Sequence, residues 1–304
     1  MPSTPYFAAV GADGLRLLSP DGKTWSRETK GKEGEVYRAV AFGNGRCVAA
    51  GTFGGRNVIA ATADATTWNA AGFDGKYRYK LLGLAHGQIA NAPTFVGFGG
   101  DPVTVGQGSP FVVTSADGVK WSDQTPIAGK NILRRLAWGD GKFVGVGDRG
   151  RRSYSADAKD WKDAPSSKAI HTLVDVAFGG PAGKQLFVGV GLHGLRAVTI
   201  DGQNWLPPVL GEEGEHLNSV LWTGKRFVAI AAGATYTSPD GYAWTRNPNA
   251  NPPLTACYGE VAGKPLYLGT AWKGRLLTSP DAITWTDVHR STSAIEAVGY
   301  GMIG

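Results

Sequence analysis

Histidine, tyrosine and arginine are the side chains of this 304-residue chain that could perform acid–base chemistry on an anionic substrate. The sequence places His171, His193 and Tyr77 on loops that we expect to share one face. A histidine and a tyrosine there could act as base and acid in a lyase, while arginines neutralise the substrate carboxylate. These three residues are the candidates for catalysis. They leave open whether the protein is an enzyme at all.

The usual signatures of metal, nucleotide and acyl-transfer chemistry do not occur in the chain. It contains no H-x-H, H-E-x-x-H or C-x-x-C spacing that would predict a metal site. It also lacks the G-x-S-x-G motif and the P-loop. We therefore expect no metal ligands and no cofactor.

The same side chains could instead bind a ligand without turning it over. The run Tyr77-Arg78-Tyr79-Lys80 leads directly into an expected inner strand. Aromatic and cationic groups side by side suit sugars and anionic rings. The predicted ligand-binding residues are Arg78, Tyr79, Tyr37, Arg38, Arg134, His171, His193 and His216.

The overall charge favours an acidic partner. The formal net charge is +6 and the isoelectric point is about 9.2. A positive protein attracts anionic ligands over long range. Nucleic acid is a less favoured partner, because the chain contains no basic run or recognition motif for it.

A short signature that recurs seven times positions these loops. Each copy has Ser or Thr, then Asp two residues later, then Trp four residues after the Asp, at steps of 39 to 53 residues. A period near forty is typical of a β-propeller, in which one blade consists of four short strands and their turns. The aspartates are Asp21, Asp64, Asp117, Asp157, Asp201, Asp240 and Asp281, and the tryptophans are Trp25, Trp68, Trp121, Trp161, Trp205, Trp244 and Trp285.

The two ends of the chain predict how the ring closes. Tyr6 to Gly11 matches the second strand of a unit, and Ala294 to Gly301 matches a first strand. The sequence therefore predicts one all-β domain over residues 1–304. It is a seven-bladed propeller of four-stranded antiparallel blades, closed by pairing of the C-terminal strand into the N-terminal blade. The expected blades are 6–28 with 294–301, 37–72, 80–125, 132–165, 172–209, 217–248 and 254–289.

The seven signatures resemble Asp-box repeats, also called bacterial neuraminidase repeats. The most similar copies are Ser19-Pro20-Asp21-Gly22-Lys23-Thr24-Trp25, Ser238-Pro239-Asp240-Gly241-Tyr242-Ala243-Trp244 and Ser279-Pro280-Asp281-Ala282-Ile283-Thr284-Trp285. They match the shorter S-P-D-G-x-x-W variant found in many bacterial propellers. The resemblance implies that each box lies on the turn between the third and fourth strands, away from the ligand face. We expect the box oxygens to accept hydrogen bonds from backbone N–H groups and the tryptophan to pack in the core.

Two functions associated with such boxes are disfavoured. Sialidases resemble this chain only in the box, since they have six blades and need an arginine triad with a Tyr–Glu pair. No Phe-Arg-Ile-Pro or Tyr-Arg-Ile-Pro motif is present here. A calcium site is disfavoured because each box aspartate stands alone, without the alternating oxygen ligands of a calcium loop.

Two further features allow both a functional and a structural interpretation. Arg16, Arg152 and Arg196 each stand five residues before their box aspartate. They could converge on an anionic ligand, or they could be surface residues at blade edges. The longest repeat step places an insertion at Gly99 to Pro110. Insertions of this kind often mark the working face of a repeat protein, but loop extensions are also simply tolerated.

Composition gives only general information about location and assembly. No run of 18 apolar residues occurs, so we expect no membrane span. Cys47 and Cys257 fall in blades separated by the first blade, and we expect two free thiols. No signal peptide is visible. We expect a monomeric bacterial protein, secreted or periplasmic, whose leader is not part of this sequence.

The sequence thus favours a recognition propeller that binds a glycan or a protein partner on its loop-rich face near the central channel. One alternative is a lyase or hydrolase acting on an acidic polysaccharide. A second alternative is a structural or assembly scaffold.

Overall fold

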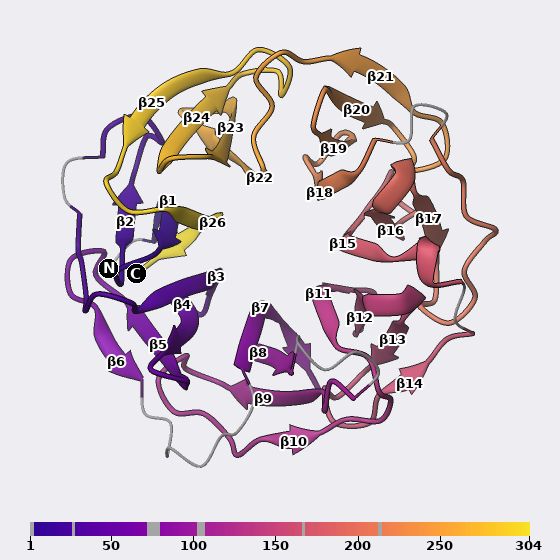
Figure 1. The fold of residues 1–304 in the computed structure, drawn as a ribbon, viewed down its shortest axis with the longest axis horizontal. Helices are drawn as coiled ribbons and strands as arrows, with labels where there is room; N and C mark the ends of the chain where they lie inside the picture. The colour runs from indigo at the N-terminus through magenta and orange to yellow at the C-terminus, as the bar shows by residue number, and fades with distance from the viewer. Residues whose placement is uncertain (1–2, 26–27, 72–79, 102–106, 166–167, 212–214) are drawn as a thin grey trace.

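Seven antiparallel sheets surround a central axis like the blades of a propeller (Figure 1). The computed structural model describes residues 3–25, 28–71, 80–101, 107–165, 168–211 and 215–304. The predicted all-β, seven-bladed fold is confirmed. Helical structure in the described chain is confined to three-residue 3-10 turns, none of which could cross a membrane.

Each blade runs from an innermost first strand to an outermost fourth strand. Blade 1 consists of β26 (Ile295–Ile303), β1 (Thr4–Gly11) and β2 (Arg16–Ser19). Blade 2 consists of β3 (Val36–Gly43), β4 (Arg46–Phe53), β5 (Arg56–Thr62) and β6 (Asn69–Ala71). Blade 3 consists of β7 (Lys80–Ile89), β8 (Ala92–Gly100), β9 (Phe111–Ser115) and β10 (Thr125–Pro126). Blade 4 consists of β11 (Leu133–Gly139), β12 (Lys142–Gly147), β13 (Arg152–Ser155) and β14 (Lys162–Asp163), with the turn η1 (Asp148–Gly150) between β12 and β13.

The remaining three blades follow the same order. Blade 5 consists of β15 (Leu173–Gly179), β16 (Leu186–Gly191) and β17 (Arg196–Thr199), with η2 (Ala169–His171) before β15 and η3 (Leu192–Gly194) before β17. Blade 6 consists of β18 (Leu217–Trp222), β19 (Phe227–Ala231), β20 (Ala234–Ser238) and β21 (Thr245–Pro248). Blade 7 consists of β22 (Thr255–Val261), β23 (Lys264–Ala271), β24 (Arg275–Ser279) and β25 (Thr286–Arg290). In blades 1 and 5 the fourth strand is reduced to isolated bridges, such as Arg16 with Thr29 and Arg196 with Val209.

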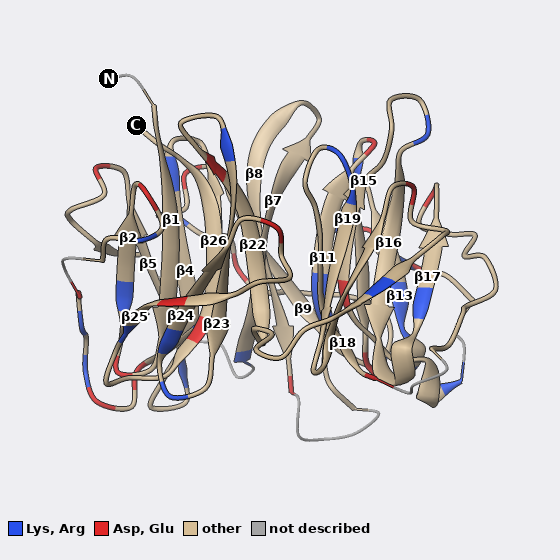
Figure 2. Cartoon of the chain, turned by 90° about the horizontal axis from the view of Figure 1, so that it is seen from above, with Lys and Arg blue, Asp and Glu red and all other residues tan. Residues whose placement is uncertain are grey.

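The chain closes the ring as predicted. The C-terminal strand β26 pairs with β1 along its length, from Thr4 opposite Ile303 to Gly11 opposite Ile295. Both termini consequently lie together on one face of the ring (Figure 2). This pairing places β26 innermost in blade 1 and leaves no inner strand edge open there.

A repeated contact between an aromatic ring and a glycine links neighbouring blades. The first strand of most blades ends in an aromatic residue followed by glycine, and the ring packs on the glycine of the preceding blade. Phe178, for example, lies so close to Gly139 that an added Cβ would stand 2.1 Å from its ring, and Trp138 stands similarly against Gly87. His86 packs in the same way on Gly43. His86 therefore packs between blades, and partial burial lowers the pKa of its imidazole.

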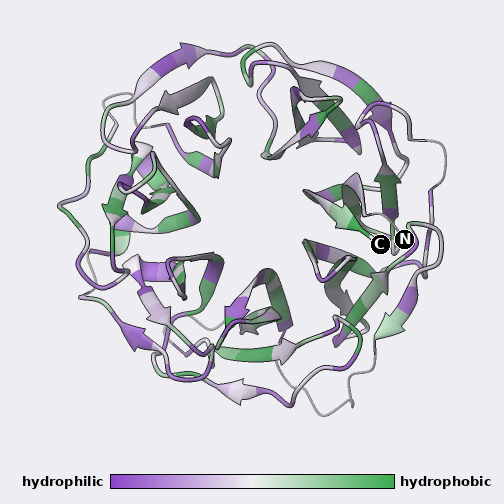
Figure 3. Ribbon diagram, turned by 180° about the vertical axis from the view of Figure 1, so that it is seen from behind, coloured by the Kyte–Doolittle hydropathy of each residue, from purple (hydrophilic) through white to green (hydrophobic). Residues whose placement is uncertain are grey.

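The interior consists of these inter-blade contacts and of pairs within each blade. The second strands contribute fully buried rings, among them Phe143, Phe187 and Phe227. Phe178 stacks on Phe187 with ring centroids 4.7 Å apart, and Trp222 stacks on Phe227 at the same distance. Hydrophobic stretches recur in strands around the whole ring (Figure 3). Cys47 takes the place of the aromatic residue in blade 2 and is a buried free thiol.

The seven boxes form nearly identical turns between the third and fourth strands. In blade 6, Ser238 Oγ donates to Asp240 Oδ1, which also accepts from the backbone N–H groups of Tyr242 and Ala243. The donation by Tyr242 lowers the pKa of the Asp240 carboxyl. Trp244 Nε1 donates to the carbonyl of Gly241 at 2.9 Å. The box is thus a self-contained turn, and the expected structural use of its oxygens and its tryptophan is confirmed.

The three arginines in equivalent positions stack on the next blade along the chain. The guanidinium of Arg16 lies 5.3 Å from the ring centroid of Tyr37, and that of Arg196 lies 5.6 Å from the Tyr236 ring. Arg152 lies 5.0 Å from the ring of Trp205. These cation–π contacts link each third strand to the adjacent blade. Each guanidinium packs on a different aromatic ring, which favours the structural interpretation of this set over the ligand one.

Candidate functional site

Six of the seven innermost strands carry one extra residue at the same position. In β11, Leu133 pairs with Gly147 and Arg135 pairs with Val146, so Arg134 is left over as a β-bulge. A bulge bends the strand and turns the side chain of its extra residue out of the ladder. The equivalent bulged residues are Glu296, Arg38, Leu82, Arg134, Val174 and Asn218.

A glycine faces this bulge in five of the six blades. At Gly147 an added Cβ would stand 2.1 Å from the carbonyl oxygen of Ile132, and at Gly51 it would stand 1.8 Å from that of Val36. The glycines at the ends of the second strands therefore let the two backbones approach where the bulge forms. In blade 6 the position is occupied by Ala231, opposite Leu217.

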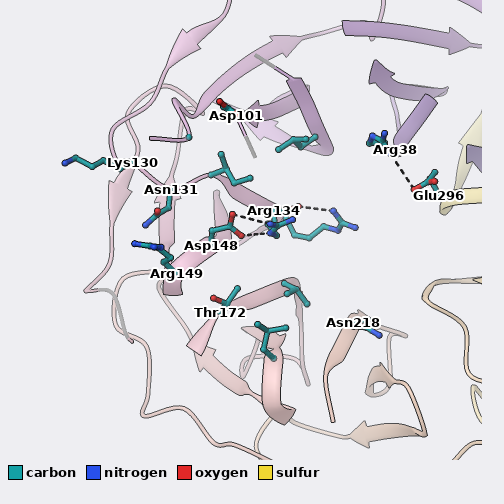
Figure 4. A pocket seen from close by; sticks show the side chains of 16 residues that line it. Arg38, Asp101, Lys130, Asn131, Arg134, Asp148, Arg149, Thr172, Asn218 and Glu296 are labelled. Atoms are coloured by element: carbon teal, nitrogen blue, oxygen red, sulfur yellow. Dashed lines mark hydrogen bonds and ion pairs between the residues drawn. The ribbon is translucent and has the colours of Figure 1, made fainter. Parts of the chain in front are cut away.

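The bulged residues surround a single cavity of about 730 Å³ at the mouth of the central channel (Figure 4). All six of them line it. The connections between second and third strands contribute Asp101, Gly108, Asp148, Arg149 and Leu192, and those that lead into first strands contribute Lys130, Asn131, Ile132 and Thr172. This is the face opposite the boxes, where the sequence predicted the site.

The lining of the cavity is rich in cations. Its described residues include five basic side chains, Arg38, Lys130, Arg134, Arg135 and Arg149, against three acidic ones, Asp101, Asp148 and Glu296. Figure 4 shows the Arg134 guanidinium facing Asp148, with Arg38 and Glu296 across the open centre from it and Lys130 and Arg149 toward the outer side.

Three ion pairs hold the central arginines in place. Arg134 donates to both carboxylate oxygens of Asp148, with Nε 2.5 Å from Oδ1 and Nη2 3.2 Å from Oδ2. Arg38 Nη1 lies 3.7 Å from Glu296 Oε2 across the seam of the ring. The side chains of Arg38 and Arg134 remain 44% and 45% exposed, so both can reach a ligand.

The third pair joins blades 4 and 5, and its carboxylate also accepts a hydrogen bond from blade 6. Arg135 Nε lies 3.8 Å from Oδ1 of Asp175 in blade 5. Asp175 Oδ2 accepts from the backbone N–H of Val220 in blade 6 at 2.8 Å. Burial raises the pKa of the Asp175 carboxyl, while Arg135 and these hydrogen bonds favour its charged form. Asp175 thereby links the first strands of blades 4, 5 and 6 next to the cavity residues Arg135, Val174 and Asn218.

A buried arginine supports the connection that carries Lys130 and Asn131 to the cavity. Arg151 is only 4% exposed, and its guanidinium donates to the carbonyls of Ala128 and Asn131 and to Asp163. The connection is thus held by hydrogen bonds to a buried cation. Its burial could not be inferred from the sequence, because Arg151 stands in the run Arg149-Gly150-Arg151-Arg152, where nothing distinguishes it from the other arginines.

The predicted site residues divide into four groups. Arg38 and Arg134 line the cavity. Tyr37 is 3% exposed and belongs to the core beneath Arg16, where burial raises the pKa of its phenol. Tyr77, Arg78 and Tyr79 lie outside the described residues, so their role in binding stays a prediction.

The histidines named as candidates lie on the loop-rich face but beside the cavity. His216 Nδ1 accepts the backbone N–H of His193 at 2.9 Å, and the two rings meet edge to face. His171 ends the turn η2, which directly precedes the lining residue Thr172. None of these three imidazoles is among the described residues that line the cavity. The part of the chain that the structure describes holds no cluster of three His, Cys, Asp or Glu side chains suited to a metal ion.

Sequence reasoning missed Glu296, Leu82, Val174 and Asn218, because an extra residue in a strand has no signature of its own. The glycine that ends the second strand in most repeats is the signal that could have located the bulges.

Replacing Gly147 by valine tests this link between glycine and bulge. The new side chain would collide with the carbonyl of Ile132, a backbone atom that cannot rotate away. We expect Gly147→Val to lower the free energy of unfolding by about 3 kcal/mol, the upper end for overpacking, as measured by urea denaturation. The matched control is Ala231→Gly at the equivalent position of blade 6, which should cost less than about 1 kcal/mol. Equal stability of Gly147→Val and wild type would contradict the proposed geometry.

Comparison with known proteins gives similarity in fold without similarity in sequence. No family model matches the chain, and no curated protein matches its sequence significantly. Among solved structures, Sqt1 of Saccharomyces cerevisiae superposes with a TM-score of 0.65 at 12% identity, covering 97% of this chain and 84% of that one. YCF48 bound to D1 peptide gives 0.59 at 14% identity, covering 81% and 82%. The computationally designed Ika8 protein gives 0.59 at 12% identity, covering 95% and 85%. Identities this low show a shared fold alone, and on that evidence the chain is a seven-bladed β-propeller.

Proposed function

We propose that this protein is a recognition module that binds an acidic segment of a partner protein in the cavity at the channel mouth. The observation that carries the proposal is the ring of bulges, which places Arg38 and Arg134 in one cavity with both guanidinium groups open to solvent. Guanidinium groups fixed in this way suit carboxylates, which they bind in a bidentate manner.

The character of the cavity supports binding rather than catalysis. Arg134 already engages Asp148 in the bidentate geometry that a ligand carboxylate would adopt. An acidic peptide could exchange with Asp148 or extend the pair. Neither His171 nor His193, the candidate bases, is among the described residues that line the cavity, so an enzyme acting on acidic glycans gains no specific support. The solved neighbour YCF48, bound to D1 peptide, favours a protein partner over a glycan as the ligand class.

Titration with defined peptides tests the proposal. Fluorescein-labelled decapeptides with one to five glutamates should be titrated by fluorescence anisotropy at low and at physiological salt. We expect the affinity to rise with glutamate number and to fall with salt, because exposed charges are screened over about 8–10 Å. The double variant Arg38→Ala/Arg134→Ala should bind the best peptide at least about tenfold more weakly, since truncated anchors dominate such sites.

The matched control removes the same charge from the opposite face. Lys184→Ala/Lys264→Ala alters two exposed lysines near first-to-second strand turns, far from the cavity lining. Both double variants remove two positive charges, so the long-range attraction falls equally in both. Because neither lysine lines the cavity, the control should keep the affinity of the wild-type protein within about twofold. An equal loss of affinity in the two double variants would show non-specific charge attraction and refute a site at the cavity.

A further inference from the structure

The most exposed large hydrophobic side chain of the described residues is a tryptophan on the same face as the cavity. Trp272 is 74% exposed and lies between β23 and β24, in the connection from second to third strand of blade 7. It is not a box tryptophan. A partner that covers an indole this open to water removes a large apolar surface from water, which favours binding.

The backbone of this connection places Trp272 at the edge of the channel mouth. Lys273 and Gly274 both have positive φ, 64° and 67°, as do Arg149 and Gly150 in blade 4 and His193 and Gly194 in blade 5. Trp272 therefore occupies in blade 7 the position that Asp148 and Leu192 occupy in blades 4 and 5. Those two residues line the cavity.

Contacts with the segment 291–296 place the connection that carries Trp272 near the cavity. Gly274 accepts the backbone N–H of Ser291 through its carbonyl. The same segment continues through Ser293, which donates to Asp13 of blade 1, and reaches the lining residue Glu296 three positions later. Blade 7 lies between the blades that contribute Asn218 and Glu296 to the lining (Figure 1). Trp272 thus flanks the sector of the cavity opposite the cluster around Arg134.

From this placement we infer that Trp272 is an apolar subsite of the recognition face, and that the ligand is a peptide carrying an aromatic or large aliphatic side chain a few residues from its acidic group. The inference rests on the proposed function and specifies its ligand. The acidic residues would engage the arginines of the cavity, and the apolar residue would cover the indole. Trp and Arg together are the side chains that most often dominate peptide and protein recognition.

The inference is tested by the preference between two matched peptides. One set contains three glutamates and a phenylalanine separated by two to five glycines, and the other has alanine in place of the phenylalanine. For the best spacing, we expect wild-type protein to bind the phenylalanine peptide about tenfold more tightly, which corresponds to about 1.4 kcal/mol. In Trp272→Ala this ratio should fall to about one, while the affinity for the alanine peptide stays unchanged. In Trp272→Phe the preference should persist.

The control and the contrary outcomes separate this inference from the proposed function. Tyr242→Ala truncates an aromatic that is 53% exposed on a box turn, and it should leave the tenfold ratio intact. A ratio near one in wild type, or a ratio unchanged in Trp272→Ala, refutes the subsite while the dependence on Arg38 and Arg134 can still stand. Failure of every acidic peptide to bind refutes the proposed function and this inference together. Trp272-dependent binding of an oligogalacturonate in place of any peptide would assign the indole to a sugar instead.

Discussion

Deleting residues 294–304 should abolish folding of the propeller. The deletion removes β26, which pairs with β1 over eight positions and contributes Tyr300, whose ring centroid lies 4.7 Å from that of Phe7. It also exposes the inner edge of β1, and an open edge strand templates association with other chains. We expect the truncated chain to lack a cooperative thermal transition and to aggregate, as measured by circular dichroism and size-exclusion chromatography.

Adding the missing strand in trans provides the control. A synthetic peptide with the sequence of residues 294–304 should restore a cooperative transition when it is present during refolding, because it supplies the same ladder and side chains. A scrambled peptide should not. A truncated chain that is monomeric and melts like wild type would contradict closure by the C-terminal strand.

Replacing Trp161 by alanine should have the second-largest effect. The side chain is 6% exposed, packs in the core with residues such as Leu136 and Phe143, and donates from Nε1 to the carbonyl of Ala158 at 3.1 Å. Truncating a buried tryptophan costs about 3–5 kcal/mol. We expect Trp161→Ala to lower the free energy of unfolding by this amount in urea denaturation. Well below the melting temperature, its affinity for acidic peptides should change less than twofold.

The matched control is the same truncation at an exposed position. Trp272→Ala removes an indole that is 74% exposed and should change the free energy of unfolding by less than about 0.5 kcal/mol. Trp161→Ala should therefore change stability without changing peptide binding, and Trp272→Ala should change the peptide preference without changing stability. Loss of binding in Trp161→Ala at native stability would mean that the box tryptophans have a ligand role.

The repeat made the fold predictable from the sequence. A hydroxyl, an aspartate and a tryptophan at fixed spacing are needed wherever the same turn forms, so Ser238, Asp240 and Trp244 identify it without any knowledge of the rest of the chain. The strand identity of the two termini predicted the closure for the same reason. A single copy of the signature could occur by chance, but seven copies at similar spacing predict one repeated structural unit.

The site was only partly predictable, because it depends on where the chain departs from a regular ladder. Arg38 and Arg134 were named from their charge near expected first strands, but whether they face the channel depends on a one-residue bulge. Tyr37 shows the difference, since it is adjacent to Arg38 and yet buried. Burial of Arg151 depends on contacts between segments distant in sequence, such as those of its guanidinium with the carbonyls of Ala128 and Asn131.

Photo-cross-linking tests the central claim, that the ring of bulges forms the recognition site. The tightest acidic peptide, carrying a diazirine beside its glutamates, should be irradiated with the intact protein and the cross-linked positions read by mass spectrometry. We expect modification to concentrate at Arg38, in 130–132, at Arg134 and Arg135, and in 148–149, which line the cavity, and to disappear with excess unlabelled peptide. Competable cross-links concentrated on the box turns, such as 238–244, would contradict the account.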